Sequence, residues 1–112
     1  MQRFPRRWDK ITCVNYLQRK IILNSIAYYE LNQSPLSDKQ YDELSRQLVE
    51  MQEDIDIKQT EYGYIMYDFD GNTGFDLYDR LNDEDKKYLM NIATYALGHK
   101  DQKSVKKKGG LF

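Results

Sequence analysis

Hydrophobic side chains recur every three or four residues over the first third of the chain. Between Trp8 and about Leu31, the apolar positions are Ile11, Val14, Leu17, Ile21, Ile22, Ile26 and Tyr29. This spacing is the period of an α-helix, and neither glycine nor proline interrupts the segment. The pattern predicts one helix of about six turns over residues 8–31, preceded by a loose basic arm at residues 1–7.

A polar turn separates this helix from a second one. The segment 32–35 ends in a proline, which cannot continue a helix and keeps the residue before it out of helical angles. Ser37, followed three residues later by Gln40, has the pattern of a capping box. Asp38 in the first turn favours the helix dipole. A new helix is therefore predicted to begin at about residue 38.

The second predicted helix has a hydrophobic stripe of its own. Its apolar positions are Tyr41, Leu44, Leu48 and Met51. The helix is expected to end at about Glu53. Because only a short turn joins the two helices, we expect an antiparallel hairpin over about residues 8–53.

The second half of the chain has a different pattern. Residues 62–69 are rich in aromatic and β-favouring side chains, which predicts a strand. Residues 70–74 are typical of a turn, and residues 75–81 fit either a second short strand or the start of a helix. Asn82 is a good N-cap for a third helix that ends at Gly98.

Together these elements predict a mainly α (α+β) fold with a long antiparallel helical hairpin, a small β ribbon or loop, and a third helix. The length of 112 residues is that of one domain. We expect this domain over residues 1–102, with the ribbon or loop and the third helix over about residues 60–98. Residues 103–112 are expected to form a flexible basic tail.

Charge and cysteine content limit the partners and the cellular compartment that we expect. The net charge of −1 excludes a general basic field for nucleic acid, although the lysines at 106–108 in the tail could contact phosphate backbones. The single cysteine, Cys13, cannot form an internal disulfide and lies in an apolar pattern, so we expect it in the core of a protein in a reducing compartment. No segment has the length of a membrane span or the pattern of a signal peptide, so a cytoplasmic location is expected.

The helical corner carries the pattern Tyr-Tyr, then Asp-x-x-Tyr-Asp-x-Leu at a fixed distance. These positions are filled by Tyr28, Tyr29, Asp38, Tyr41, Asp42 and Leu44. Over about residues 20–53 the chain resembles the N-terminal subdomain of bacterial NAD-dependent DNA ligases. In that family the segment is a helical hairpin that grips the nicotinamide mononucleotide half of NAD.

The resemblance implies a nicotinamide site lined by Tyr28, Tyr29, Asp38, Tyr41 and Asp42. Aromatic faces can stack on a nicotinamide ring, and the positive charge of that ring adds a cation–π attraction. Phenol hydroxyls and carboxylates can hold the carboxamide and the ribose hydroxyls. The alternative is a simple helix hairpin in which Tyr28 and Tyr41 pack across the corner.

The chain departs from the ligase family in its chemistry. The nucleophilic lysine of the family lies in a Lys-x-Asp-Gly motif, and this sequence contains no such motif. We therefore expect a protein that is not an enzyme. Because the resemblance covers the hairpin without the catalytic motif, we expect a small binding or regulatory protein of the kind that phage genomes encode.

A second constellation overlays the calcium-binding loop of EF-hands. Oxygen ligands at positions 1, 3, 5, 9 and 12 of that loop would be Asp68, Asp70, Asn72, Asp76 and Asp79. Thr73 stands where the loop needs its sharp-turn glycine, and the last ligand is Asp instead of Glu. The alternative is a turn-rich loop with capping carboxylates.

Two functions remain open. The first is a non-catalytic protein that binds a host protein or ribonucleoprotein, such as a replication machine or a CRISPR nuclease. Acidic side chains that could mimic phosphates for such a partner are Asp68, Asp70, Asp76, Asp79, Asp83, Glu84 and Asp85. The alternative is a module that binds nicotinamide mononucleotide or NAD, or one subunit of a split nucleotidyl transferase. The oligomeric state stays open.

Overall fold

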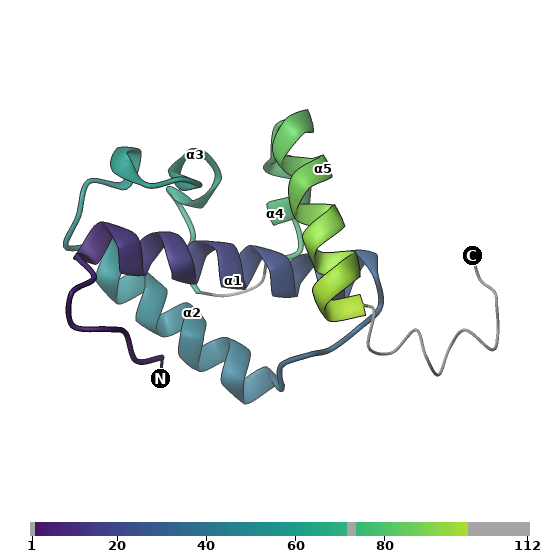
Figure 1. Cartoon of the computed structure of the whole chain (residues 1–112), viewed down its shortest axis with the longest axis horizontal. Helices are drawn as coiled ribbons and strands as arrows, with labels where there is room; N and C mark the ends of the chain where they lie inside the picture. Colours follow the sequence, from purple (N-terminus) through teal and green to yellow (C-terminus); the bar gives the residue numbers. More distant parts are fainter. Residues whose placement is uncertain (1, 72–73, 99–112) are drawn as a thin grey trace, which may run out of the picture.

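The computed structural model describes residues 2–71 and 74–98, and the fold is mainly α as predicted (Figure 1). No strand occurs within those two ranges. The helices are α1 (Lys10–Glu30), α2 (Asp38–Gln52), the 3₁₀ turn η1 (Ile57–Gln59), α3 (Gly63–Met66), α4 (Leu77–Arg80), α5 (Asp83–Ile92) and the π-helical turn η2 (Ala93–Gly98). None of the described helices is long and apolar enough to span a bilayer. The predicted tail at residues 103–112 lies outside the described ranges.

The predicted hairpin is present, with α2 running back beside α1 (Figure 1). At the end of α1, Asn32 adopts a left-handed φ of 56°, which asparagine tolerates better than most residues. The reversal lets the amide of Gln33 donate to the carbonyl of Ala27 at 2.8 Å. The capping box then starts α2, because Gln40 N donates to Ser37 Oγ at 3.1 Å and Ser37 N donates to Gln40 Oε1 at 2.9 Å.

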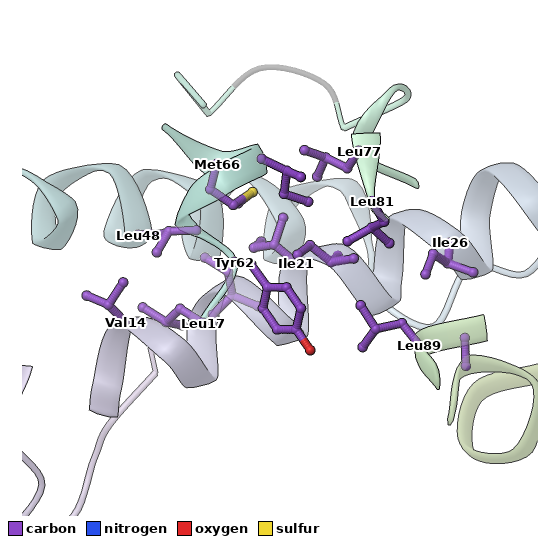
Figure 2. Packing of buried hydrophobic residues seen from close by; sticks show 14 residues of the cluster. Val14, Leu17, Ile21, Ile26, Leu48, Tyr62, Met66, Leu77, Leu81 and Leu89 are labelled. Carbon is purple, nitrogen blue, oxygen red and sulfur yellow. The ribbon is translucent and has the colours of Figure 1, made fainter. Parts of the chain in front are cut away.

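The core surrounds α1, which is covered by α2 on one side and by the second half of the chain on another (Figure 1). Figure 2 shows side chains from α2, α3, α4 and α5 converging on this helix. Among the buried residues are Val14, Leu17, Ile21, Ile26, Leu48, Tyr62, Met66, Leu77, Leu81 and Leu89. Cys13 is buried at 6% exposure, as expected, and this burial raises the pKa of its thiol.

The strand predicted at residues 62–69 is wrong, and of the alternatives left open for residues 62–81 the β ribbon does not occur in the described residues. The segment 62–69 contains α3, in which the amides of Ile65 and Met66 both donate to the carbonyl of Tyr62 at 3.0 Å. These three side chains are all buried, and their i, i+3, i+4 spacing places them on one face of a helical turn. Burial at helical spacing outweighs the β propensity of the aromatic residues. The segment 75–81 forms α4, so of its two predicted alternatives the helix is correct.

The N-terminal arm is also not loose over its described residues. Gln2 and Gln47 exchange two hydrogen bonds of 2.9 Å, which attaches the arm to α2. Phe4 lies 5.8 Å from Trp8 and 5.8 Å from Tyr16, measured between ring centroids. These aromatic contacts and the hydrogen bonds to α2 hold the basic arm in place, which the sequence did not predict.

Candidate functional site

A hollow of about 180 Å³ lies where the end of α1 meets the start of α2. Its wall combines one side of α1, the turn and the first residues of α2, namely Asn24, Ser25, Tyr28, Tyr29, Ser34, Pro35, Leu36, Asp38 and Tyr41. Four of the five residues named by the ligase resemblance are in this wall. The fifth, Asp42, is exposed on α2 and does not line the hollow.

Local rules of the chain explain this gathering. Tyr28 and Tyr29 occupy the last turn of α1, immediately before the reversal at Asn32. The capping box fixes where α2 begins, so Asp38 and Tyr41 come three residues apart on the first turns of that helix. The two tyrosines of α1 and the two residues of α2 therefore face a common space.

The floor of the hollow is a hydrogen-bonded pair. The hydroxyls of Ser25 and Tyr41 lie 2.8 Å apart, so α1 and α2 are joined directly beneath the wall. Burial raises the pKa of Tyr41, and the hydrogen bond with Ser25 opposes that rise in part. The phenol is therefore neutral at physiological pH and keeps its proton for donation.

Gly74 closes the floor from the second half of the chain. A Cβ atom at this position would lie 2.6 Å from the hydroxyl of Tyr41 and closer still to Oγ of Ser25. The backbone at Gly74 thus lies directly against the hydroxyl pair, and only glycine fits without displacement. The sequence marks Gly74 as a turn residue, and nothing in its local pattern connects it to α1.

Asn24 adds an acceptor to the wall. Its Nδ2 donates to the carbonyl of Lys20 at 2.8 Å, and this bond fixes the orientation of the amide because a carbonyl can only accept. Its Oδ1 is buried and receives no hydrogen bond from the described part of the chain. Leaving a buried acceptor unpaired costs about 1–3 kcal/mol, and because this oxygen is not exposed, a ligand N–H reaches it only after the wall shifts.

Sequence reasoning missed Asn24 and Ser25, although a signal was available. They precede Tyr28 and Tyr29 by four residues each, which places each pair on one face of α1. Two small polar side chains in the middle of an apolar helical pattern are typical of a site wall or of a satisfied core contact. The tyrosines that follow four residues later on the same face favour a site wall over a core contact.

The electrostatics of the hollow are those of an aromatic cage. Three phenol rings face it, and Asp38 is the only charged side chain among the lining residues. Such a cage attracts flat or cationic groups by stacking and by cation–π interaction. An apolar protein cavity of about 150 Å³ is known to hold one benzene molecule, so this volume suits a single six-membered ring.

The predicted calcium ligands do not form a comparable site in the described residues. Arg80 binds Asp68 at 2.6 Å and Asp76 at 3.2 Å, so its guanidinium already draws these two carboxylates together. Within residues 2–71 and 74–98, no group of three or more side chains of the metal-binding types comes together. Asn72 lies outside those ranges, and the calcium loop stays a prediction.

Some carboxylates of the predicted acidic surface are also engaged in contacts within the chain. Beyond the two carboxylates held by Arg80, Asp85 accepts a 2.6 Å hydrogen bond from the hydroxyl of Tyr64. Asp83 and Glu84 are exposed in the first turn of α5. The lysines at 106–108, which were predicted to contact nucleic acid, lie outside the described residues.

Comparison with known proteins adds no relative: no protein-family model, no curated protein and no solved structure matches this chain.

Proposed function

We propose that the chain is a non-catalytic binding module that takes the nicotinamide ring of nicotinamide mononucleotide or NAD into the hollow between α1 and α2. One observation carries the proposal. Tyr28, Tyr29, Asp38 and Tyr41 gather around a space of about 180 Å³ that suits one aromatic ring.

Each part of a nicotinamide group has a matching feature in the wall. The rings of Tyr28 and Tyr29 offer stacking surfaces, and the carboxylate of Asp38 complements the positive charge of the pyridinium. The carboxamide carries an N–H donor and a carbonyl acceptor, and the hydroxyls of the lining tyrosines can pair with either. Nicotinic acid is ionised at neutral pH, so its carboxylate has no donor and is repelled by Asp38.

The module binds without turnover. Transfer of an adenylyl group from NAD in the ligase family needs the lysine of the Lys-x-Asp-Gly motif, which is missing from this sequence. The lining residues include no lysine. We therefore expect the bound nucleotide to be released intact.

Isothermal titration calorimetry with nicotinamide mononucleotide tests the proposal. We expect measurable binding that is weakened about tenfold in Asp38→Asn and in Tyr28→Ala, because each loses roughly 1–2 kcal/mol of interaction with the ring. Tyr88→Ala is the matched control, since Tyr88 is 50% exposed on α5 and does not line the hollow. No heat at millimolar ligand, or equal loss in the control, would refute the proposal.

A second candidate is a regulatory protein that docks on a basic surface of a host machine, as a phage-encoded inhibitor of a replication complex or a CRISPR nuclease would. One observation favours it: Asp83, Glu84 and Tyr88 share a hollow of about 410 Å³ on α5, where two exposed carboxylates adjoin an exposed ring and outnumber the one lining cation, Lys87. Arginine-rich surfaces bind such combinations of charge and aromatic side chains.

Pull-down from host extract distinguishes this candidate from the first. A partner retained by the wild type and by Tyr28→Ala, but lost in the triple variant Asp83→Asn, Glu84→Gln, Tyr88→Ala, would support it. Equal retention by all three proteins would remove it.

A further inference from the structure

Three aromatic rings form a continuous rim beside the hollow. Tyr28 and Tyr29 meet edge to face with ring centroids 4.8 Å apart, and Phe75 meets Tyr29 in the same manner at 6.5 Å. All three are exposed, at 54%, 45% and 61% respectively. We call these residues the aromatic rim. It extends the apolar wall of the hollow outward to the segment that precedes α4.

The position of Phe75 is fixed by its neighbour in the chain. The backbone of Gly74 lies against the hydroxyls of Ser25 and Tyr41, so the next residue must emerge beside the end of α1. Phe75 is therefore held next to Tyr29 by the same contact that closes the floor. Because the backbone beside Phe75 is anchored and its ring already contacts Tyr29, only rotation of the side chain must be restricted when a ligand stacks on it.

The volume of the hollow limits what can enter it. A space of about 180 Å³ suits one ring, so the remainder of a larger ligand must lie outside. Tyr29 lines the hollow and also belongs to the aromatic rim. A ligand that leaves the hollow past Tyr29 meets Phe75 next.

We propose, resting on the nicotinamide site above, that the aromatic rim stacks a second ring of the same ligand, so the module recognises a dinucleotide in preference to a mononucleotide. The second ring is the adenine of NAD, which lies over Phe75 and Tyr29. Base stacking on aromatic side chains contributes about 1–3 kcal/mol per base by alanine substitution. The preference for NAD over nicotinamide mononucleotide is therefore expected to be about tenfold.

The charges near the aromatic rim determine whether the pyrophosphate of NAD contacts the protein. Asp38 is the single charged residue of the hollow, and Asp76, beside Phe75, is held by Arg80 at 3.2 Å. No lysine or arginine lines the hollow, and Arg80, which shares a neighbouring hollow with Phe75, is already paired with Asp68 and Asp76, so we expect the pyrophosphate to stay in solvent. Binding through rings alone is weakly sensitive to salt, unlike binding through phosphate contacts. The preference for NAD should persist when the salt concentration is raised.

Calorimetry with both nucleotides on the wild type, Phe75→Ala and Tyr88→Ala tests the inference. We expect NAD to bind the wild type about tenfold more tightly than the mononucleotide, and Phe75→Ala to abolish that difference while leaving the affinity for the mononucleotide within about twofold. Tyr88→Ala, an exposed ring away from the hollow, should retain the difference. Because Phe75 is 61% exposed, its replacement leaves the core intact.

The outcomes separate the two proposals. If the mononucleotide binds but NAD binds no more tightly, or if Phe75→Ala weakens both equally, the second-ring inference is overturned while the nicotinamide site stands. If neither nucleotide binds at millimolar concentration, both proposals fail. A preference for NAD that disappears at high salt would also overturn the inference, because it would assign the preference to the phosphates.

Discussion

Replacement of Gly74 by alanine probes the contact that joins the two halves of the chain beneath the hollow. The added Cβ would lie 2.6 Å from the hydroxyl of Tyr41, 3.0 Å from Cδ1 of Leu77 and closer still to Oγ of Ser25. Real Cβ atoms do not approach other atoms this closely, so the hydroxyl pair must separate or the backbone must withdraw.

The magnitude follows from three effects. Overpacking of a well-filled site costs about 1–3 kcal/mol. Loss of the hydrogen bond between Ser25 and Tyr41 costs about 1 kcal/mol. The lower entropy of alanine in the unfolded chain offsets about 0.4–1 kcal/mol. The expected net loss is about 2 kcal/mol, which corresponds to a fall in Tm of roughly 10 °C for a domain of this size.

Urea denaturation followed by circular dichroism measures this loss, and a double-mutant cycle locates it. The double variant Ser25→Ala, Tyr41→Phe removes the two oxygens that the new Cβ would meet. In that background Gly74→Ala should cost less than about 1 kcal/mol, because only Leu77 still crowds the methyl group. If Gly74→Ala is as stable as the wild type, or costs the same in both backgrounds, the floor is not built as described.

Three further predictions concern contacts outside the hollow. Gln18→Leu should destabilise the fold by about 1–3 kcal/mol in urea denaturation, because the buried amide of Tyr62 loses its 3.1 Å acceptor; an unchanged midpoint would contradict this. Burial, together with a hydrogen bond to a carboxylate, raises the pKa of Tyr64 to about 12. Its neutral form is therefore favoured in the fold, and this contribution is complete below the ordinary value of 10 and is lost as pH rises from there through about 12. In an absorbance titration, the change near pH 12 should be smaller by one phenol in Tyr64→Phe; an unchanged amplitude would assign it to other residues such as Tyr41 and Tyr62, whose pKa values burial also raises. The hydrogen bond from Arg80 lowers the pKa of Asp68 below 3.8, so the pair stabilises the fold above that pH and ceases to do so as pH falls through the lowered value. Arg80→Gln should therefore reduce stability more at neutral pH than in strong acid, where only its 2.9 Å hydrogen bond to the carbonyl of Ile65 is lost, and an equal loss at both would exclude the ion pair as the cause.

The sequence predicts the hairpin well because the signals are local. The helical period, the proline turn and the capping box of Ser37 and Gln40 each act within a few residues, and the structure has all three. The start of α5 was predicted for the same reason, since Asn82 accepts from the amide of Asp85 at 2.7 Å. The predicted third helix ran to residue 98, whereas α5 gives way to the π-helical turn η2 at Ala93.

The second half was harder to predict because its local signals conflict with its burial. Aromatic and β-favouring residues at 62–69 favour a strand, yet Tyr62, Ile65 and Met66 reach the core only through a helical turn. The choice depends on α1, which offers the apolar surface that these side chains cover (Figure 2). No pattern within the segment contains that information.

The candidate site shows the same contrast between residues on the hairpin and residues from the second half of the chain. The candidate residues on the hairpin, such as Tyr28 and Asp38, were implied by the resemblance to the ligase subdomain, and all of them except Asp42 meet around one hollow. Gly74 and Phe75 were missed as site residues because their relation to the hairpin exists only after the chain folds back. Arg80 was missed as well, although its place four residues after Asp76 marks a helical ion pair.

The claim that the hollow between α1 and α2 binds a nicotinamide ring is tested most directly by a titration with nicotinamide mononucleotide followed through backbone amide chemical shifts. Shifts that saturate and are concentrated at residues 24–41 are the result we predict. Unchanged spectra at millimolar ligand, or shifts centred on α5, would contradict the claim.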